Sequence, residues 1–458
     1  MKFRNTLILF ILLVALGAYV YFVEIKKHQK TEESQKASKK VFTLLQDSLQ
    51  SIMFRNDNGS FSLKKIQGQW KITDPLYTEA DETTLNSMLS SLLNAEKDKE
   101  FSIAPEELSD YGLDNRAVLV TVETNQGEKE SIRMGDNTPV GSFVFSTESD
   151  SQVFTINQSV KNNFTKKLFD IRDKKILHFK RADVQQIILH NPFGKFDFEK
   201  ASATDWNLRN INRLADNTKI SGLLSKLENN RIKEFVDEEG SQLKKYGLDK
   251  PEYQIDLSLG PEQGQKRLFI SRAVGKKYYA RDESRKPIFE VDSFLVKDIN
   301  QKITDFRTKD LVSFSRSDIN RISWEYPDTL FSCVKDTAGN WLVDDQARQA
   351  VQQQKISSFL SNLDLTSIVE FVKDDTYDPA SYGLDRPQLK LTLYQDADLQ
   401  VEVKLGKTKD KNIYTVTNQY QSVYLIAESK LKELKLKLAD IIEQPVTTSQ
   451  EIEPAGEE

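Results

Sequence analysis

Apolar side chains recur along this chain in three blocks that share one helical pattern. The spacing i, i+3, i+4, i+7 places four apolar residues on one face of a helix. It occurs within residues 85–92, 220–227 and 356–363, with mostly polar residues between the apolar ones. We therefore predict one amphipathic helix in each block.

Each predicted helix is followed by an alternation of apolar and other residues, which indicates a strand with one buried face. The alternating positions are Val118, Val120 and Val122, then Ile255, Leu257 and Leu259, then Leu389, Leu391 and Leu393. A second strand is expected to end near Gly135, Ser271 and Gly406, and a later one to centre on residues 153–154, 288–289 and 423–424. Apolar positions within 164–171, 299–306 and 434–441 predict a closing helix. Every block thus predicts a meander of about four strands that ends in a helix.

Two landmarks keep the blocks in a common register. The tetrapeptide Tyr-Gly-Leu-Asp starts at residues 111, 246 and 382, and tryptophan stands at 70, 206 and 341, so both recur after 135 or 136 residues. Units of this length favour complete domains over a solenoid, because each can bury its own core. The predicted fold class is α+β, with one N-terminal transmembrane helix followed by three tandem homologous α+β units of about 135 residues. We expect the three units to have the same strand order.

The units are expected to meet at charged junctions. We interpret Asp170 with Arg172, and Asp305 with Arg307, as charge pairs that contribute little stability if exposed. The predicted organisation is an anchor at 1–23, a charged linker at 24–40, repeat units at 41–176, 177–311 and 312–442, and a disordered acidic tail at 443–458.

The tetrapeptide is interpreted as a helix stop. Its residues are Tyr111, Gly112, Leu113 and Asp114, then Tyr246, Gly247, Leu248 and Asp249, then Tyr382, Gly383, Leu384 and Asp385. Glycine at the C′ position of a short helix takes a positive φ, and the next leucine can pack back on the last turn. Pro251 and Pro387 then start an extended segment, whereas the first unit has no proline there. A ligand or metal role for the aspartates is the alternative, although one carboxylate per unit makes no metal cage.

The tryptophans Trp70, Trp206 and Trp341 are expected to fill the core of each unit's first hairpin, because apolar strand positions surround them. A carbohydrate-binding platform is the alternative for these rings.

An uncharged apolar run at 7–23 predicts a membrane anchor. As a helix, its seventeen residues would span about 26 Å, at the short end of what crosses a bilayer core of about 30 Å. Tyr19, Tyr21 and Phe22 suit the membrane interface. A cleaved signal peptide is the alternative, but the run is longer than a usual signal core and lacks an A-x-A site.

Charges around the anchor give opposite indications of its orientation. Lys2 and Arg4 favour a cytoplasmic N-terminus, whereas Lys26, Lys27 and Lys30 lie just beyond the helix. A short tail before a long folded body usually acts as a signal anchor, so we expect a single-pass protein of the inner (cytoplasmic) membrane with an extracytoplasmic body. The linker is interpreted as a solvated tether, and contact of its lysines with anionic lipid is the alternative.

The charge balance excludes nucleic acid as a partner. The net charge is −5, and residues 1–40 carry +5 from eight basic and three acidic residues, which leaves −10 for the remainder. Such an acidic body has no electrostatic footprint for nucleic acid.

Sequence signals for catalysis are also missing. The chain has no Walker A, G-x-G-x-x-G, G-x-S-x-G or H-E-x-x-H motif, and the single cysteine, Cys333, has no CxxC partner. His178 and His190 lack the spacing of zinc ligands. Three similar units rarely build three active sites, so we expect no catalytic residue, no cofactor and no metal.

These features together resemble the bacterial family known as domain of unknown function 4340. The resemblance rests on the N-terminal anchor, the repeated tetrapeptide with Pro251 and Pro387, and the alternating strands that lead to Gly135 and Gly406, and it covers residues 41–442. It implies a single-pass envelope protein, since many members are encoded beside ABC-type transporters related to the gliding-motility export system. The resemblance implies no catalytic residue. The first unit departs from the family pattern, because no proline follows its tetrapeptide.

Three functions follow as hypotheses. The leading one is a non-catalytic, membrane-anchored envelope protein that is an accessory or interaction component of an ABC-type transport complex, with sheet edges or grooves offered to a protein partner. The second is a binding protein for an envelope glycan or lipid, which a cluster of exposed aromatics would favour. The third is an unrecognised hydrolase, which a convergent pair of acids in a deep pocket would support.

Overall fold

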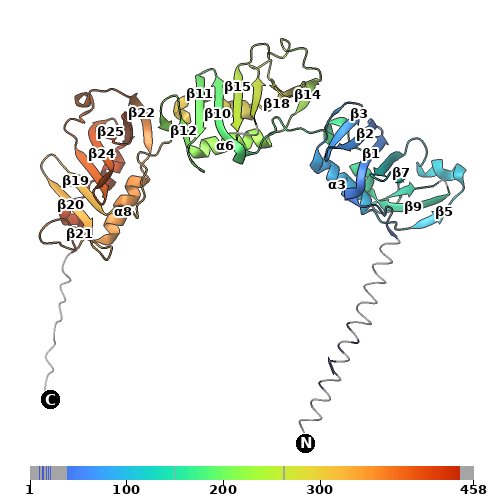
Figure 1. Ribbon diagram of the computed structural model, residues 1–458, viewed down its shortest axis with the longest axis horizontal. Coiled ribbons are helices and arrows are strands. Elements are labelled where there is room, and N and C mark those ends of the chain that lie inside the picture. Colours follow the sequence, from blue (N-terminus) through green and yellow to red (C-terminus); the bar gives the residue numbers. More distant parts are fainter. Residues whose placement is uncertain are drawn as a thin grey trace, which may run out of the picture. The chain divides into compact units, whose positions relative to one another are not determined.

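The computed structural model describes residues 39–443 except 150 and 261–263, together with residues 10, 13, 14, 17, 19 and 21 (Figure 1). The expected anchor and linker lie almost entirely outside the described residues, and so does the acidic tail beyond Glu443. Within the described part of the chain, no helix is both long and apolar enough to cross a membrane.

Three antiparallel sheets follow one another along the chain, and helices accompany each. The first repeat contains η2 (Gln46–Ser48), β1 (Leu49–Asn56), β2 (Gly59–Ile66), β3 (Gln69–Asp74), β4 (Thr78–Glu79), α3 (Glu82–Leu93), β5 (Glu100–Ser102), η3 (Pro105–Tyr111), β6 (Val118–Thr124), β7 (Lys129–Asn137), β8 (Phe143–Thr147), β9 (Gln152–Asn157), α4 (Gln158–Asn163) and α5 (Leu168–Ile171). The second contains η4 (Arg181–Asp183), β10 (Val184–Asn191), β11 (Gly194–Lys200), β12 (Trp206–Leu208), β13 (Arg213–Leu214), α6 (Asn217–Asn229), β14 (Glu234–Asp237), β15 (Tyr253–Leu259), β16 (Gln265–Ile270), β17 (Tyr278–Asp282), β18 (Ile288–Val291), α7 (Ser293–Ile299) and η5 (Ile303–Asp305). The third contains β19 (Arg321–Glu325), β20 (Leu330–Lys335), β21 (Trp341–Val343), α8 (Gln353–Asp364), β22 (Ile368–Asp374), η6 (Pro379–Tyr382), β23 (Leu389–Gln395), β24 (Asp398–Lys409), β25 (Asn412–Thr417), β26 (Ser422–Ala427), α9 (Glu428–Leu434) and α10 (Leu438–Ile441).

The strand order is the same in the three sheets, which confirms the expectation of a common topology. The orders are β4-β3-β2-β1-β6-β7-β8-β9-β5, then β13-β12-β11-β10-β15-β16-β17-β18-β14, then β21-β20-β19-β23-β24-β25-β26-β22. In the third sheet an isolated bridge between Leu342 and Ala350 stands where β4 and β13 lie in the others. The expected four-strand meander is β6–β9, β15–β18 and β23–β26.

The long helix of each repeat lies against one face of its sheet, as the apolar spacing predicted (Figure 1). Leu85, Met88, Leu89 and Leu92 of α3 are fully buried, and α6 and α8 bury their equivalent residues. Trp70, Trp206 and Trp341 are only 7, 4 and 4% exposed, which confirms that they are core residues rather than an exposed platform.

The closing helix was predicted as one element, and the prediction was wrong. The first repeat has α4 and α5 with a break between them, and the other repeats are broken in the same way. The amide of Asn56 donates to the carbonyl oxygens of Phe164 and Lys166 at 2.6 and 2.9 Å, so these carbonyls bond to a strand residue instead of continuing a helix. Asn191 makes the same two bonds in the second repeat, to Ile299 and Gln301.

Residue contacts divide the chain into two compact units. One comprises residues 1–175 with 231–234, and the other comprises 176–230 with 235–458. Residues 231–234 join the first unit because the N–H of Ile232 donates to the carbonyl oxygen of Lys174. The second and third sheets therefore share one unit, and their junction is described below.

Candidate functional site

The Tyr-Gly-Leu-Asp glycines have the backbone conformation that the sequence predicted. Gly112, Gly247 and Gly383 have φ of 66°, 68° and 69°. The leucine after each donates its N–H to the carbonyl oxygen five residues earlier, as in a Schellman motif: Leu113 to Leu108, Leu248 to Leu243, and Leu384 to Pro379. The helices so closed are 3₁₀ in the first and third repeats, whereas the second repeat has only turns there.

The tyrosine and leucine of each motif build a small apolar cluster apart from the main core. The tyrosine ring packs edge-on against an aromatic ring of the third meander strand, with centroids 4.8–4.9 Å apart: Tyr111 on Phe145, Tyr246 on Tyr279, and Tyr382 on Tyr414. The leucines Leu113, Leu248 and Leu384 are buried beside them. Such ring pairs contribute about 0.5–1.5 kcal/mol beyond simple burial.

Two further glycines allow the motif to approach the sheet. A Cβ on Gly135 would lie 2.2 Å from the carbonyl oxygen of Tyr111, and one on Gly406 would lie 2.3 Å from that of Tyr382. The second repeat has Ser271 here, and its buried hydroxyl accepts the N–H of Tyr279 at 3.0 Å. Backbone packing therefore requires glycine in two repeats, and the other repeat has serine, whose hydroxyl is hydrogen bonded.

The motif aspartates lie on three different repeats. The one side-chain contact described for them is between neighbouring residues of the first repeat. Asp114 pairs with Arg116 at 3.0 Å, and this hydrogen bond lowers the pKa of the Asp114 carboxyl. Asp249 and Asp385 are exposed. The predicted motif residues thus form three separate caps, and the sequence alternative of a ligand role gains no geometric support from them.

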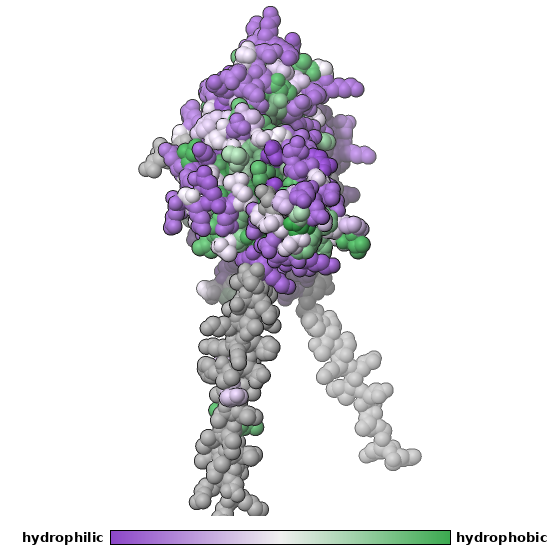
Figure 2. Space-filling model, turned by 90° about the vertical axis from the view of Figure 1, so that its right-hand side faces the viewer, coloured by the Kyte–Doolittle hydropathy of each residue, from purple (hydrophilic) through white to green (hydrophobic). Residues whose placement is uncertain are grey.

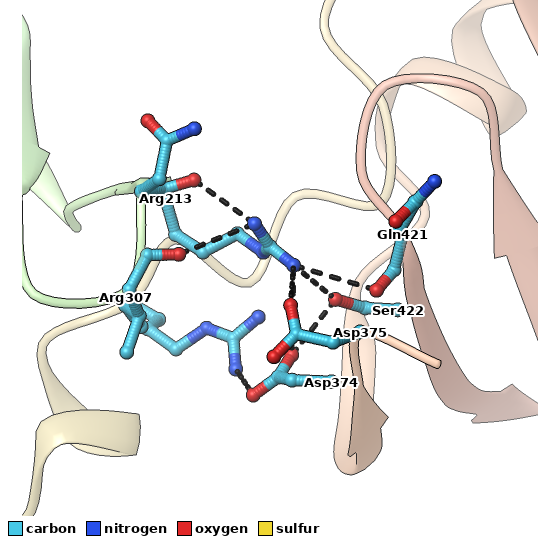
Figure 3. Close-up of polar contacts among 8 residues, drawn as sticks. Arg213, Arg307, Asp374, Asp375, Gln421 and Ser422 are labelled. Atoms are coloured by element: carbon cyan, nitrogen blue, oxygen red, sulfur yellow. Dashed lines mark hydrogen bonds and ion pairs between the residues drawn. The ribbon is translucent and has the colours of Figure 1, made fainter. Parts of the chain in front are cut away.

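A polar cluster lies between the second and third repeats, and Arg307 is its one member that the sequence singled out (Figure 3). Arg307, which follows η5, is only 3% exposed, and its Nη1 donates to the Asp374 carboxylate at the end of β22, at 3.0 Å. Its guanidinium also lies 3.9 Å from the ring centroid of Phe371. The charge pair predicted between Asp305 and Arg307 was wrong: Arg307 pairs with Asp374, while Asp305 accepts the backbone N–H of Lys302.

Arg213 on β13 completes the cluster from the side of the second repeat. Its Nη2 donates to the Ser422 hydroxyl at 2.9 Å, and that hydroxyl donates to Asp374 at 2.7 Å. The same Nη2 lies 4.0 Å from Asp374 and 3.8 Å from Asp375, and Nη1 donates to the backbone of Ile211 and Asn212 (Figure 3). The two arginines of one repeat therefore converge on the acids of the next.

The electrostatics of the cluster favour ionised Asp374. Burial by itself would raise the pKa of this carboxyl, but the Ser422 hydrogen bond and the Arg307 charge outweigh burial, and the pKa is lowered. Burial raises the pKa values of Tyr420 and Tyr424 beside it, so both phenols stay neutral at physiological pH.

Backbone and amide contacts extend the junction beyond the charges. The chain after Arg307 pairs with the segment after α8, where Leu311 N–H donates to Thr366 O and Ile368 N–H to Lys309 O. The Gln419 side chain accepts the N–H of Ser313 and donates to its carbonyl oxygen.

A groove lies next to this cluster. Its volume is ≈ 500 Å³, and its lining residues are Asn207, Ile211, Asn212, Arg213, Leu214, Asp375, Gln419, Tyr420 and Gln421. The sequence does not reveal this site, because its residues come from two repeats, about 160 or more positions apart, and carry no shared spacing.

Cys333 is unsuited to nucleophilic chemistry. It is fully buried, and burial raises the pKa of its thiol to about 12.

The fold and its junctions define a class, namely a tandem-repeat protein of three antiparallel sheets with glycine-capped loops in register. Comparison with family sequences gives three matches to the family described as Domain of unknown function (DUF4340), over residues 70–239, 206–381 and 341–455. Since these matches together run from residue 70 to 455, the chain belongs to this family. Each match starts at one of the three core tryptophans, on the third strand of its sheet. No match was found among curated proteins or among solved structures.

Proposed function

We propose that this protein is a non-catalytic, membrane-anchored envelope protein and an accessory component of an ABC-type transport complex. The observation that carries the proposal is that the conspicuous residues have structural roles. The motif glycines end helices or turns, the tryptophans lie in the cores, and the junction arginines connect the second and third repeats. Residues committed in this way to the fold support a scaffold that presents surfaces to a protein partner.

The apolar run at 7–23 supports the anchored part of the proposal. The short tail before a long folded body favours an extracytoplasmic body at the inner membrane. The described body suits an aqueous setting, because the face drawn in Figure 2 is mostly hydrophilic, with apolar residues scattered in small patches. The partner suggested by the family resemblance is the transporter itself.

The sheet edges are less suited to a partner than the sequence analysis expected. β4 and β13 have two residues each, β5 has three, and the register of β22 shifts at two places. Short and irregular edges hinder pairing with another strand. We therefore assign partner binding to loops and grooves rather than to strand addition.

Affinity capture tests the proposal. The full-length protein, tagged at its C-terminus and solubilised from its native membranes in detergent, should capture transporter subunits identified by mass spectrometry. A variant without residues 1–23 should lose them if the complex forms through the membrane, whereas Asp249→Asn should capture them normally. Recovery of no membrane protein above an untagged control would refute the proposed complex.

A further inference from the structure

The groove between the second and third repeats has the size of a small-molecule site. Its ≈ 500 Å³ falls within the range of about 300–1,000 Å³ that such sites occupy. One wall comes from β12, β13 and the loop between them, and the other comes from the segments that precede β26 and follow β22. Since the Arg213 and Arg307 contacts hold these walls together, the groove is formed before any ligand arrives.

Three side-chain amides in this groove have no hydrogen-bond partner within the described part of the chain. They belong to half-buried Asn207 and to Asn212 and Gln421, which are exposed to solvent. A primary amide offers two N–H donors and an acceptor oxygen. By contrast, the amide of Gln419 bonds to the Ser313 backbone in both directions and thereby fixes the wall. The free amides thus provide donors and acceptors to a ligand.

The charges of the groove compensate one another. Arg213 is only 10% exposed and bonds to Ser422 and to backbone oxygens, while Asp374 and Asp375 balance the two arginines of the junction. An anionic ligand would find no unpaired cation in this groove, and a cationic ligand would compete with Arg213. The groove therefore favours a neutral ligand that is rich in hydroxyl or amide groups.

Tyr420 adds an aromatic surface to the groove. Its ring lies 5.2 Å from the Arg213 guanidinium and lines the groove. A tyrosine ring offers an apolar surface beside its polar hydroxyl. Free amides beside an aromatic ring match the alternating hydroxyl and C–H surfaces of a sugar.

We propose that this groove binds a neutral oligosaccharide through the amides of Asn207, Asn212 and Gln421 and the ring of Tyr420. An extended peptide is less favoured because the nearest strand edge is already occupied. Thr308 N–H donates to Leu214 O, and Ala215 bridges to Arg307, so the backbone at Leu214 and Ala215 is already paired. The proposal goes beyond the proposed function, since it assigns a carbohydrate ligand to one groove and does not depend on a transport partner.

Ligand titration tests the proposal. The full-length protein, in a detergent without a sugar headgroup, is titrated by calorimetry and saturation-transfer NMR with tetra-N-acetylchitotetraose, cellotetraose and maltotetraose. At least one should bind saturably, and the double variant Asn207→Ala/Gln421→Ala should weaken its binding at least tenfold. The control Gln346→Ala removes an exposed amide from the corresponding loop of the third repeat and should leave the affinity unchanged.

The outcomes separate this proposal from others. The double variant should keep the melting temperature of the parent, because neither amide bonds to the described chain. No saturable binding by any tetrasaccharide, or equal binding by the double variant, overturns the proposal, and so does saturation of the groove by an extended peptide instead. Capture of transporter subunits is measured on the same variant and should persist, so that a failure of the glycan site does not count against the transport complex.

Discussion

The guanidinium of Arg307 donates a 3.0 Å hydrogen bond to the carboxylate of Asp374, a residue 67 positions later in the following repeat. Arg307 is almost wholly buried, whereas Asp374 keeps 40% of its side chain exposed. Ser422 and Arg213 complete the same cluster from both sides of the junction. The second and third repeats therefore share one polar joint.

Replacing Asp374 should loosen this joint. Asp374→Asn removes the negative charge opposite buried Arg307, and the loss should be about 1.5 kcal/mol, the low end for hydrogen bonds to charged groups. Hydrogen exchange should rise mainly in residues 306–311 and 366–374. The control Asp375→Asn changes an 85% exposed carboxyl and should have little effect.

The same pair gives a pH dependence with a definite sign. The pKa of Asp374 is lowered in the folded protein, so its carboxylate contributes stability above the unfolded pKa of about 4. That contribution is lost as the pH falls through the lower folded value. Protection factors at the junction, which correct for the pH dependence of the intrinsic exchange rate, should therefore be constant from pH 8 to 5 and fall only below about pH 4. Asp374→Asn should abolish the Asp374 part of this fall.

The motif glycines should differ in their tolerance of alanine. Gly247→Ala should cost about 1 kcal/mol, because alanine resists a positive φ, while the nearest atoms to the new Cβ are side chains at 3.3 Å or more. Gly383→Ala should cost more, since the Cβ would lie 2.9 Å from the backbone nitrogen of Lys407. Chemical denaturation measures both.

The helix α6 supplies a matched control for these glycine variants. Gly222 lies inside α6, and an added Cβ meets nothing within 4 Å, so Gly222→Ala should stabilise by about 0.5–1 kcal/mol. If Gly247→Ala leaves the melting temperature unchanged but abolishes binding of a partner, the motif is a recognition site instead.

In the third repeat, Tyr326 should stabilise the break in the closing helix, as an asparagine does in the other two repeats. It occupies the position of Asn56 and Asn191, and its hydroxyl donates to the Leu436 carbonyl oxygen at 2.6 Å. Tyr326→Phe should cost about 1 kcal/mol by removing this bond. Because burial raises the pKa of Tyr326 to about 12, the loss should be the same from pH 6 to 9. A loss that varies with pH in this range would contradict this assignment.

Deleting residues 1–23 should release a soluble, folded protein. The described body buries its apolar residues in sheets and helices, and the apolar run of the sequence lies within the deleted segment. The truncated protein should stay in the supernatant after carbonate extraction, whereas the full chain should pellet. If the truncated protein also pellets, another segment holds it to the membrane.

The sequence by itself determined the repeat, the buried helix faces, the core tryptophans and the positive φ of Gly112, Gly247 and Gly383. These features depend on local periodicity and on backbone sterics, and both are readable from neighbouring residues. The unbroken closing helix was predicted wrongly for the opposite reason: the amide of Asn56 that bonds at its break lies 108 residues earlier.

Only the tertiary structure decided what Arg307 and Arg213 do. The spacing of Arg307 predicted only a local charge pair with Asp305, and no sequence prediction was made for Arg213. A sequence pattern cannot show which distant carboxylate packs against a buried guanidinium. Asp374 and Ser422 meet these arginines only after two sheets have folded and their loops have come together. The groove with its free amides arises from the same long-range packing, so the repeat was visible in the chain and its candidate binding site was not.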